Sequence, residues 1–364
     1  MTRLGIGSAL RHWQGHARQW LHRLRANPIL EELRGGAGAG RHAGSTAVAM
    51  FAFAIAPLYM TPAHAEEWPN KPVRLVVPFA SGGATDLLAR ALALELGKQW
   101  KQPVVVDNRP GAGGAVGAEV VAKSAADGYT LLLASGSMFT VNPYIYHKLP
   151  YSTQSFEMIS KVASGPMVVT VNTKVPAKTV AELISYAKAN PGKLTFGSAG
   201  NGSQVHIASE AFAEAAGMEV VHVPYKGDGP AYADLMAGVI DMTVGNINGI
   251  SPLLKGNRLR ALAVTGKERS PLLPDVPTVA EAGLPGFSFY GWFALMAPAG
   301  TSKDLTAKMY ADLERAVSEP SMQRYLAAQG MTKTLSPNGR LVEEIAQESG
   351  RWKVLVARRK ISAN

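Results

Sequence analysis

Two glycine-rich segments are the parts of this sequence best suited to chemistry with a ligand, and that chemistry would be anion binding by the backbone. Residues 78–86 read PFASGGATD, and residues 197–204 read GSAGNGSQ. Glycine lets the backbone approach a ligand closely or adopt a positive φ. Each segment opens a helical pattern, and the first N–H groups of a helix are unpaired and favour negative charge. Neither segment contains Lys or Arg, so they predict main-chain sites for a carboxylate or a phosphate.

The same residues also have structural explanations. Glycine-rich turns after strands serve helix packing, and Thr85 or Asp86 could act only as an N-cap. His206, one turn into the second helical pattern, could face the ligand or be a hydrogen-bonded structural histidine. Residues 225–227 (YKG) end a predicted strand and could line the same cleft, although a solvated Lys226 explains them equally well.

The sequence lacks the common catalytic motifs. A third glycine-rich segment, residues 111–117 (GAGGAVG), suggests a dinucleotide-binding loop, but its third glycine falls one residue late and no acidic residue ends a second strand at the expected distance. Nucleophile-elbow, zinc-protease, phosphate-loop and EF-hand patterns are absent. The lack of cysteine excludes thiolate metal sites and cysteine nucleophiles. We therefore expect no catalytic residue, no metal site and no cofactor.

The elements that position these segments alternate along the chain. Leu88, Leu92 and Leu96, for example, recur at the spacing that places them on one face of a helix. Alternating strands and helices predict an α/β fold with mostly parallel sheets flanked by helices. The expected strands are residues 73–79, 104–107, 130–135, 167–172, 193–197, 220–225, 241–245 and 260–265. The expected helices include residues 86–100, a helix opened by the capping box at 179–182, and residues 203–216, 231–238, 303–318, 321–329 and 339–359.

The first 65 residues are predicted to be a signal peptide with an extended basic N-terminal region. Residues 47–56 form an apolar run of ten, a length typical of a signal peptide and short for a membrane span of about 20 residues. Residues 63–65 (AHA) match a signal-peptidase site, so we expect export to the periplasm with cleavage after Ala65; an uncleaved anchor is the alternative. Half of the formal charge of +10 lies in this leader, so we expect no nucleic-acid partner.

Motifs along the rest of the chain, from about Trp68 to the C-terminal helices, resemble those of the Bug family. These are the periplasmic solute-binding proteins of tripartite tricarboxylate transporters. The matching segments are VPF at 77–79, GG at 82–83 with Asp86, AR at 89–90, NRPGAGG at 108–114, DGYTL at 127–131, ANPGKL at 189–194, GS at 197–198, VPYKG at 223–227, LPDVPT at 273–278 and APAG at 297–300.

The resemblance implies a two-lobed, periplasmic-binding-protein-like fold that closes on its ligand. Residues 66–167 plus 291–364 would form the first lobe and residues 168–290 the second, joined by crossing strands at residues 166–171 and 289–297. In the family the ligand is usually a small carboxylate held between the lobes by main-chain groups and ordered water. Carried onto this sequence, the ligand-binding residues are Phe79, Gly82, Gly83, Thr85, Asp86, Ser135, Gly136, Ser198, Gly200, Asn201, Gly202, Ser203, His206, Tyr225, Lys226 and Gly227.

The expected function is that of a periplasmic receptor which delivers a small organic acid to the membrane permease subunits of such a transporter. The same fold and pocket would also suit a ligand sensor acting on a membrane sensor kinase. A phosphate- or nucleotide-dependent enzyme is a more remote alternative. We expect no turnover of the bound acid, and a monomer, because closing lobes need free surfaces.

Overall fold

The computed structural model describes residues 68–363, apart from the side chain of Asn338. The expected signal peptide and its cleavage after Ala65 lie outside the described residues. Within the described part, no helix has both the length and the apolar character needed to cross a membrane.

Ten strands of the described residues form one sheet, in the order β2-β1-β3-β9-β4-β7-β5-β6, with β8 and β10 paired to β4 outside this path. Strand β4 serves both parts of it: residues 156–166 pair with β9, and residues 167–172 pair with β7 and β8. The first half-sheet is β1, β2, β3, β9, β10 and residues 156–166; the second is β5, β6, β7, β8 and residues 167–172. The strands are β1 (Val73–Val77), β2 (Val104–Asn108), β3 (Thr130–Ser135), β4 (Phe156–Asn172), β5 (Thr195–Ser198), β6 (Val221–Pro224), β7 (Met242–Asn246), β8 (Leu259–Val264), β9 (Tyr290–Pro298) and β10 (Thr332–Pro337).

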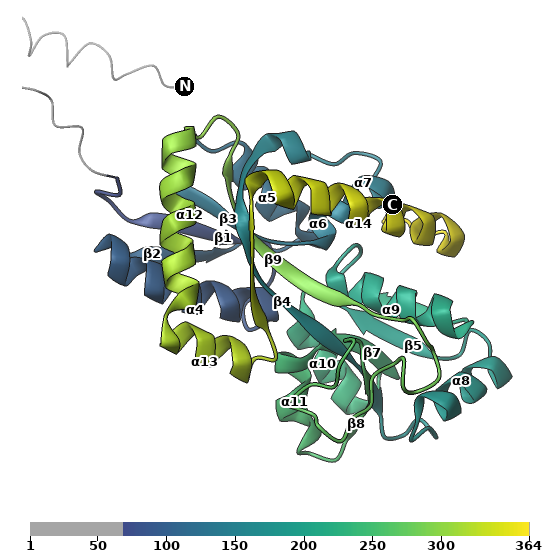
Figure 1. The fold of residues 1–364 in the computed structure, drawn as a ribbon. Helices are drawn as coiled ribbons and strands as arrows, with labels where there is room; N and C mark the ends of the chain where they lie inside the picture. The colour runs from purple at the N-terminus through teal and green to yellow at the C-terminus, as the bar shows by residue number, and fades with distance from the viewer. Residues whose placement is uncertain (1–67, 364) are drawn as a thin grey trace, which may run out of the picture. The chain divides into compact units, whose positions relative to one another are not determined.

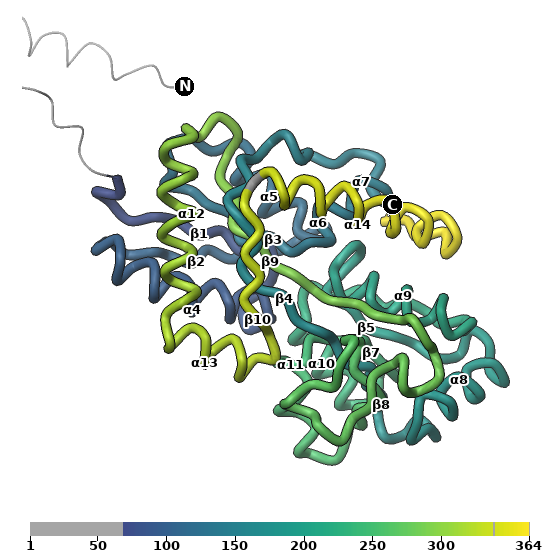
Figure 2. The backbone as a smooth tube through the Cα atoms, in the orientation of Figure 1, coloured from purple at the N-terminus to yellow at the C-terminus, as the bar shows by residue number. Residues whose placement is uncertain are grey.

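Parallel pairing is confined to the outer strands of each half-sheet. Strand β1 is parallel to β2 and β3, and β5 is parallel to β6 and β7. The pairs of β4 and β9 are antiparallel, and Figure 2 shows β10 running beside β4. Each half-sheet is therefore mixed. Parallel neighbours need a crossover connection, usually through a helix, and β4 and β9 are antiparallel neighbours without one.

Helices flank both half-sheets, with α4, α12 and α13 beside the first and α8, α10 and α11 beside the second (Figure 1). The helices are α4 (Ala84–Trp100), α5 (Ala115–Ala122), α6 (Ser137–Thr140), α7 (Asn142–Ile145), α8 (Val180–Ala189), α9 (Gln204–Ala216), α10 (Asp228–Ala237), α11 (Ile247–Leu254), α12 (Lys303–Ser318), α13 (Pro320–Ala328) and α14 (Asn338–Arg359), with short 3-10 turns at Ala112–Gly114 and Thr153–Ser155. The fold is thus an α/β fold in which helices cover a mixed sheet.

Two helices begin two or three residues earlier than the sequence predicts. Helix α4 starts at Ala84 with Gly83 at its N-cap and no side-chain cap, so neither Thr85 nor Asp86 is the N-cap that the sequence allowed. Helix α10 starts at Asp228, directly after Gly227. Both early starts bring a helix N-terminus closer to the glycine-rich segments.

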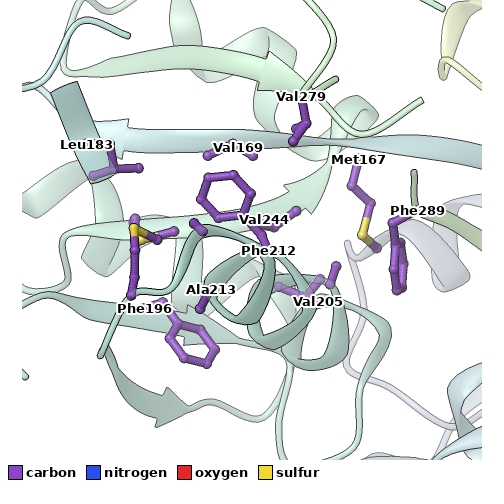
Figure 3. Packing of buried hydrophobic residues seen from close by; sticks show 14 of the residues in the cluster. Met167, Val169, Leu183, Phe196, Val205, Phe212, Ala213, Val244, Val279 and Phe289 are labelled. Carbon is purple, nitrogen blue, oxygen red and sulfur yellow. The ribbon is translucent and has the colours of Figure 1, made fainter. Parts of the chain in front are cut away.

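The core of the second half-sheet lies between its strands and α9. Phe212 of α9 is fully buried in the same cluster as Val169 of β4 and Val244 of β7, and Figure 3 shows its ring against these strands. Burying one such side chain contributes roughly 1.5–3 kcal/mol.

Helix α14 contributes to the cores of both half-sheets. Leu341 and Ile345 pack with residues of the first half-sheet, whereas Trp352 and Leu355 belong to the cluster around α9.

The predicted lobe boundaries, 66–167 plus 291–364 and 168–290, stay a prediction.

Candidate functional site

Two neighbouring pockets lie where the glycine-rich segments meet. The inner pocket is a cavity of about 20 Å³, close to the smallest volume that holds one water molecule. Of the predicted ligand-binding residues, it is lined by Phe79, Gly83, Thr85, Ser135 and Ser203. The outer pocket has about 240 Å³ and is lined by Phe79, Gly200, Asn201, Tyr225 and Lys226 of the same set. The fold thus brings residues of both segments together.

The other predicted residues line neither pocket. They lie within or beside the glycine-rich segments, where their contacts are with the protein itself. They are Gly82, Asp86, Gly136, Ser198, Gly202, His206 and Gly227. Their part in ligand binding stays a prediction.

Asp86 stabilises the turn of the first glycine-rich segment by a hydrogen bond within that segment. Its carboxylate accepts hydrogen bonds from the Gly82 N–H at 2.9 Å, Arg90 Nε at 2.9 Å and Asn108 Nδ2 at 3.0 Å. Burial works to raise the pKa of this carboxyl group, but these bonds outweigh it and hold the pKa below its usual value. Because Asp86 occupies the Gly82 amide and the Ala84 N–H hydrogen-bonds to Asp228, the N–H groups of the first turn of α4 that remain for a ligand are those of Thr85 and Asp86.

Two stacked histidines support the second glycine-rich segment. The Gly202 N–H donates to His206 Nδ1 at 3.1 Å, and Ser198 Oγ lies 2.6 Å from His222 Nε2. The two rings stack with centroids 3.8 Å apart. Burial lowers the pKa of His222 to about 4, and burial together with the neighbouring His222 lowers that of His206 well below its usual value. Both rings are therefore neutral at pH 7 and act as hydrogen-bonding supports.

The third glycine-rich segment is a contact surface for the second one. A Cβ at Gly113 would lie 2.2 Å from the Asn201 carbonyl oxygen. The Tyr146 hydroxyl donates to that oxygen at 3.1 Å, and Asn142 Nδ2 donates to the Gly113 carbonyl at 3.0 Å. The close approach of two backbones explains the glycine here, in keeping with the imperfect match to a dinucleotide-binding loop.

Gln204, at the start of α9, joins that helix to β9. Its Nε2 donates to the Trp292 carbonyl at 3.1 Å, and its Oε1 accepts from the Trp292 N–H at 2.7 Å. The Gly136 N–H donates to the same carbonyl at 3.0 Å, and a Cβ at Gly136 would lie 2.2 Å from the Trp292 ring. Gly136 is therefore a point of close backbone approach to Trp292.

Asp228 reaches the inner pocket from α10 and was not among the predicted residues. Gly227, with φ 147°, packs its backbone against Ala80, which places the Asp228 carboxyl at the N-terminus of α4. The N–H of Ala84 hydrogen-bonds to this carboxyl, and Asn246 Nδ2 donates to Oδ2 at 3.3 Å. Oδ1 is buried and has no hydrogen-bond partner in the described part of the chain. Burial raises the pKa of Asp228 to about 6.

The inner pocket is rich in donors and poor in charge. No Lys, Arg or His lines it, and Asp228 is the one ionisable side chain among its lining residues. Across residues 68–363, no group of three or more His, Cys, Asp or Glu side chains is placed to hold a metal ion. Hydroxyl groups and the N–H groups of a helix end can bind a polar solute reversibly.

Two half-sheets that share β4, with helix N-termini meeting at a pocket, define a solute-binding protein of the periplasmic-binding-protein fold. The family model described as "Tripartite tricarboxylate transporter family receptor" matches residues 88–361, and the chain belongs to this family. The family match confirms the resemblance seen in the sequence.

Curated relatives from bacteria match most of the chain. Protein BugT from Bordetella pertussis is 38% identical over 293 residues, which cover 80% of this chain and 90% of that protein. A UPF0065 protein from Pseudomonas sp. strain P51 is 36% identical over 301 residues, which cover 82% and 89%.

Solved structures of similar proteins include two that hold carboxylates. Rpa4515 from R. palustris, solved with adipate, is 35% identical and superposes with a TM-score of 0.78, over 81% of this chain and 99% of that one. MatC from Rhodopseudomonas palustris, solved with bound malate, is 32% identical with a TM-score of 0.74, over 79% and 100%.

Proposed function

We propose that this protein is a periplasmic solute-binding protein that holds a small carboxylate at the inner pocket and delivers it to the permease subunits of a tripartite tricarboxylate transporter. The observation that carries the proposal is the meeting of both glycine-rich segments at one pocket, lined by the N-terminus of α4 and by Thr85, Ser135 and Ser203. These N–H and hydroxyl groups can donate to carboxylate oxygens without a cationic side chain. The adipate and malate held by similar proteins support a carboxylate as the solute class.

Binding requires the two lobes to separate and to close again on the solute. The cavity of about 20 Å³ is too small for an organic acid. We place the lobes at residues 66–167 plus 291–364 and at residues 168–290, with the change of lobe where β4 passes from one half-sheet to the other. A receptor of this kind works by a difference in free energy between open and closed states, so the solute leaves unchanged.

Calorimetry of the mature protein, residues 66–364, with a panel of mono- and dicarboxylates of three to six carbons tests the proposal. We expect one or more acids to bind, and Gly83→Val to weaken that binding at least tenfold because its side chain enters the space beside the first turn of α4. The backbone at Gly83 has φ −82°, which valine adopts freely, and the nearest atom to an added Cβ is Asp228 Oδ2 at 3.5 Å, so the variant should fold.

The matched control is Gly350→Val, because Gly350 lies in α14 with open space around an added Cβ. Retained affinity in Gly83→Val, or no binding of any acid by the wild type, would contradict carboxylate binding at this pocket. Delivery has its own readout. Uptake of the bound acid by cells that lack this gene should return with the wild type and stay absent with Gly83→Val.

A further inference from the structure

Asp228 lines the pocket in which the solute is proposed to bind, and one of its carboxyl oxygens is buried. Its Oδ2 accepts from Asn246 at 3.3 Å, whereas Oδ1 has no partner in the described part of the chain. A buried charged oxygen without a partner is costly. Asp228 also lies in the first turn of α10, where an acidic residue favours its own helix. That effect explains an acidic residue at this position but not the burial of an unpaired oxygen.

The charges around this carboxyl do not balance once an acid binds. The inner pocket contains no Lys, Arg or His. The groups that face Asp228 are the Ala84 N–H, the Asn246 amide and the Tyr232 side chain, whose pKa burial and Asp228 raise well above its usual value. The end of a helix supplies about half of one positive charge. A second carboxylate beside Asp228 would therefore leave a buried net negative charge, which is unfavourable.

We propose that the solute of this protein carries an ammonium group that pairs with Asp228, so that the solute class is amino acids and other zwitterionic acids. The inference rests on the proposed function, because it assigns the solute of the same pocket. The carboxylate of such a solute binds the first turn of α4, and its ammonium donates to Oδ1. A hydroxyl group in place of the ammonium would fill the missing hydrogen bond but would leave the negative charges unbalanced.

The test compares acids that differ in one group. Binding of L-aspartate, L-malate and succinate, and of L-glutamate, L-2-hydroxyglutarate and glutarate, is measured by calorimetry at pH 7.5. L-alanine, L-lactate and propionate form a third set. We expect the amino member of one or more sets to bind at least tenfold more tightly than its hydroxy and unsubstituted counterparts. In Asp228→Asn, which keeps the shape of the side chain, we expect that preference to fall below threefold.

Asp304→Asn is the matched control, because Asp304 is an exposed acidic residue in the first turn of α12, away from the pocket. It should bind as the wild type does, and circular dichroism should show that both variants fold. If unsubstituted or hydroxy acids bind as well as the amino acids, or if Asp228→Asn keeps the preference, the ammonium assignment is wrong while carboxylate binding stands. If no acid of any set binds, both proposals fail.

Discussion

Asp86 and Asp228 are two aspartates near the same helix N-terminus, the first buried and the second partly buried, and their partners separate their roles. Asp86 receives three hydrogen bonds, one of them from the Arg90 guanidinium, and its pKa is held below the usual value. Asp228 receives one side-chain bond at 3.3 Å, and its pKa rises to about 6. A carboxylate with satisfied oxygens supports a loop, whereas one with an unsatisfied oxygen is available to a ligand.

The pH dependence of stability provides a prediction for Asp228. Its folded pKa of about 6 exceeds the ordinary value of 3.8, so between these values the folded state binds the proton more tightly than the unfolded state. The stabilisation of the fold by the Asp228 carboxyl group is therefore fully present below pH 3.8 and is lost as the pH rises through 6. In Asp228→Asn, we expect the free energy of unfolding to exceed that of the wild type by about 1–3 kcal/mol at pH 7.5.

The gain should be small at pH 4, where Asp228 is protonated in the folded protein. Urea denaturation of both proteins at the two pH values measures the difference, with Asp304→Asn as the control. An equal difference between wild type and variant at pH 4 and pH 7.5 would show that the Asp228 carboxyl is not buried in the free protein. Stability gained together with affinity lost is the pattern expected of a residue kept for binding.

At the scale of elements, Gln204 links a helix of the second half-sheet to a strand of the first. The Trp292 N–H has Gln204 Oε1 as its acceptor, and Gln204 is 8% exposed. In Gln204→Leu, we expect the free energy of unfolding to fall by about 1–3 kcal/mol, because a buried N–H loses its acceptor. Gln347→Leu, at an exposed position of α14, controls for the change from glutamine to leucine. Urea denaturation measures both, and equal stabilities would contradict the role of the Gln204–Trp292 bonds.

Local patterns in the sequence predicted the elements better than their pairing. The leucines at 88, 92 and 96 lie buried on one face of α4, as their spacing predicts. The first half of β4, residues 156–165, was not predicted as a strand, because Glu157 and Lys161 interrupt its apolar residues. Strand β10 was missed as well, since its residues are mostly exposed and it is held by pairing with β4. Such pairs join residues far apart in the chain, which local periodicity does not record.

The candidate site was predictable to the extent that it consists of turns. Glycine marks positions of close backbone approach, and both predicted segments do meet at the pockets. Asp228 was not predicted as a site residue, although it directly follows the predicted residues 225–227. A single aspartate at the start of a helix has an ordinary explanation in the helix dipole. Only the fold shows that this one faces the N-terminus of another helix.

At the scale of the whole described chain, the third glycine-rich segment, residues 111–117, lies where the two proposed lobes are in contact. Gly113 belongs to the first lobe and Asn201 to the second, and their backbones approach so closely that a Cβ at Gly113 would lie 2.2 Å from the Asn201 oxygen. In the proposed two-lobed arrangement, this contact forms only when the lobes are closed. A side chain at Gly113 should therefore disfavour closure without changing any residue that lines the inner pocket, which separates the motion from the binding groups.

Gly113→Ala tests this separation, with Gly192→Ala as its control. Both glycines have a positive φ, 58° and 68°, but an added Cβ at Gly192 meets no atom within 4 Å. Both variants thus bear the same backbone cost of about 1–2 kcal/mol, and only Gly113→Ala obstructs Asn201. For an acid that binds the wild type, we expect at least a tenfold loss of affinity in Gly113→Ala and little change in Gly192→Ala. Small-angle X-ray scattering should show that the acid reduces the radius of gyration of the wild type and of Gly192→Ala but not of Gly113→Ala at the same concentration. Equal compaction of all three proteins would mean that the contact between these backbones does not control closure.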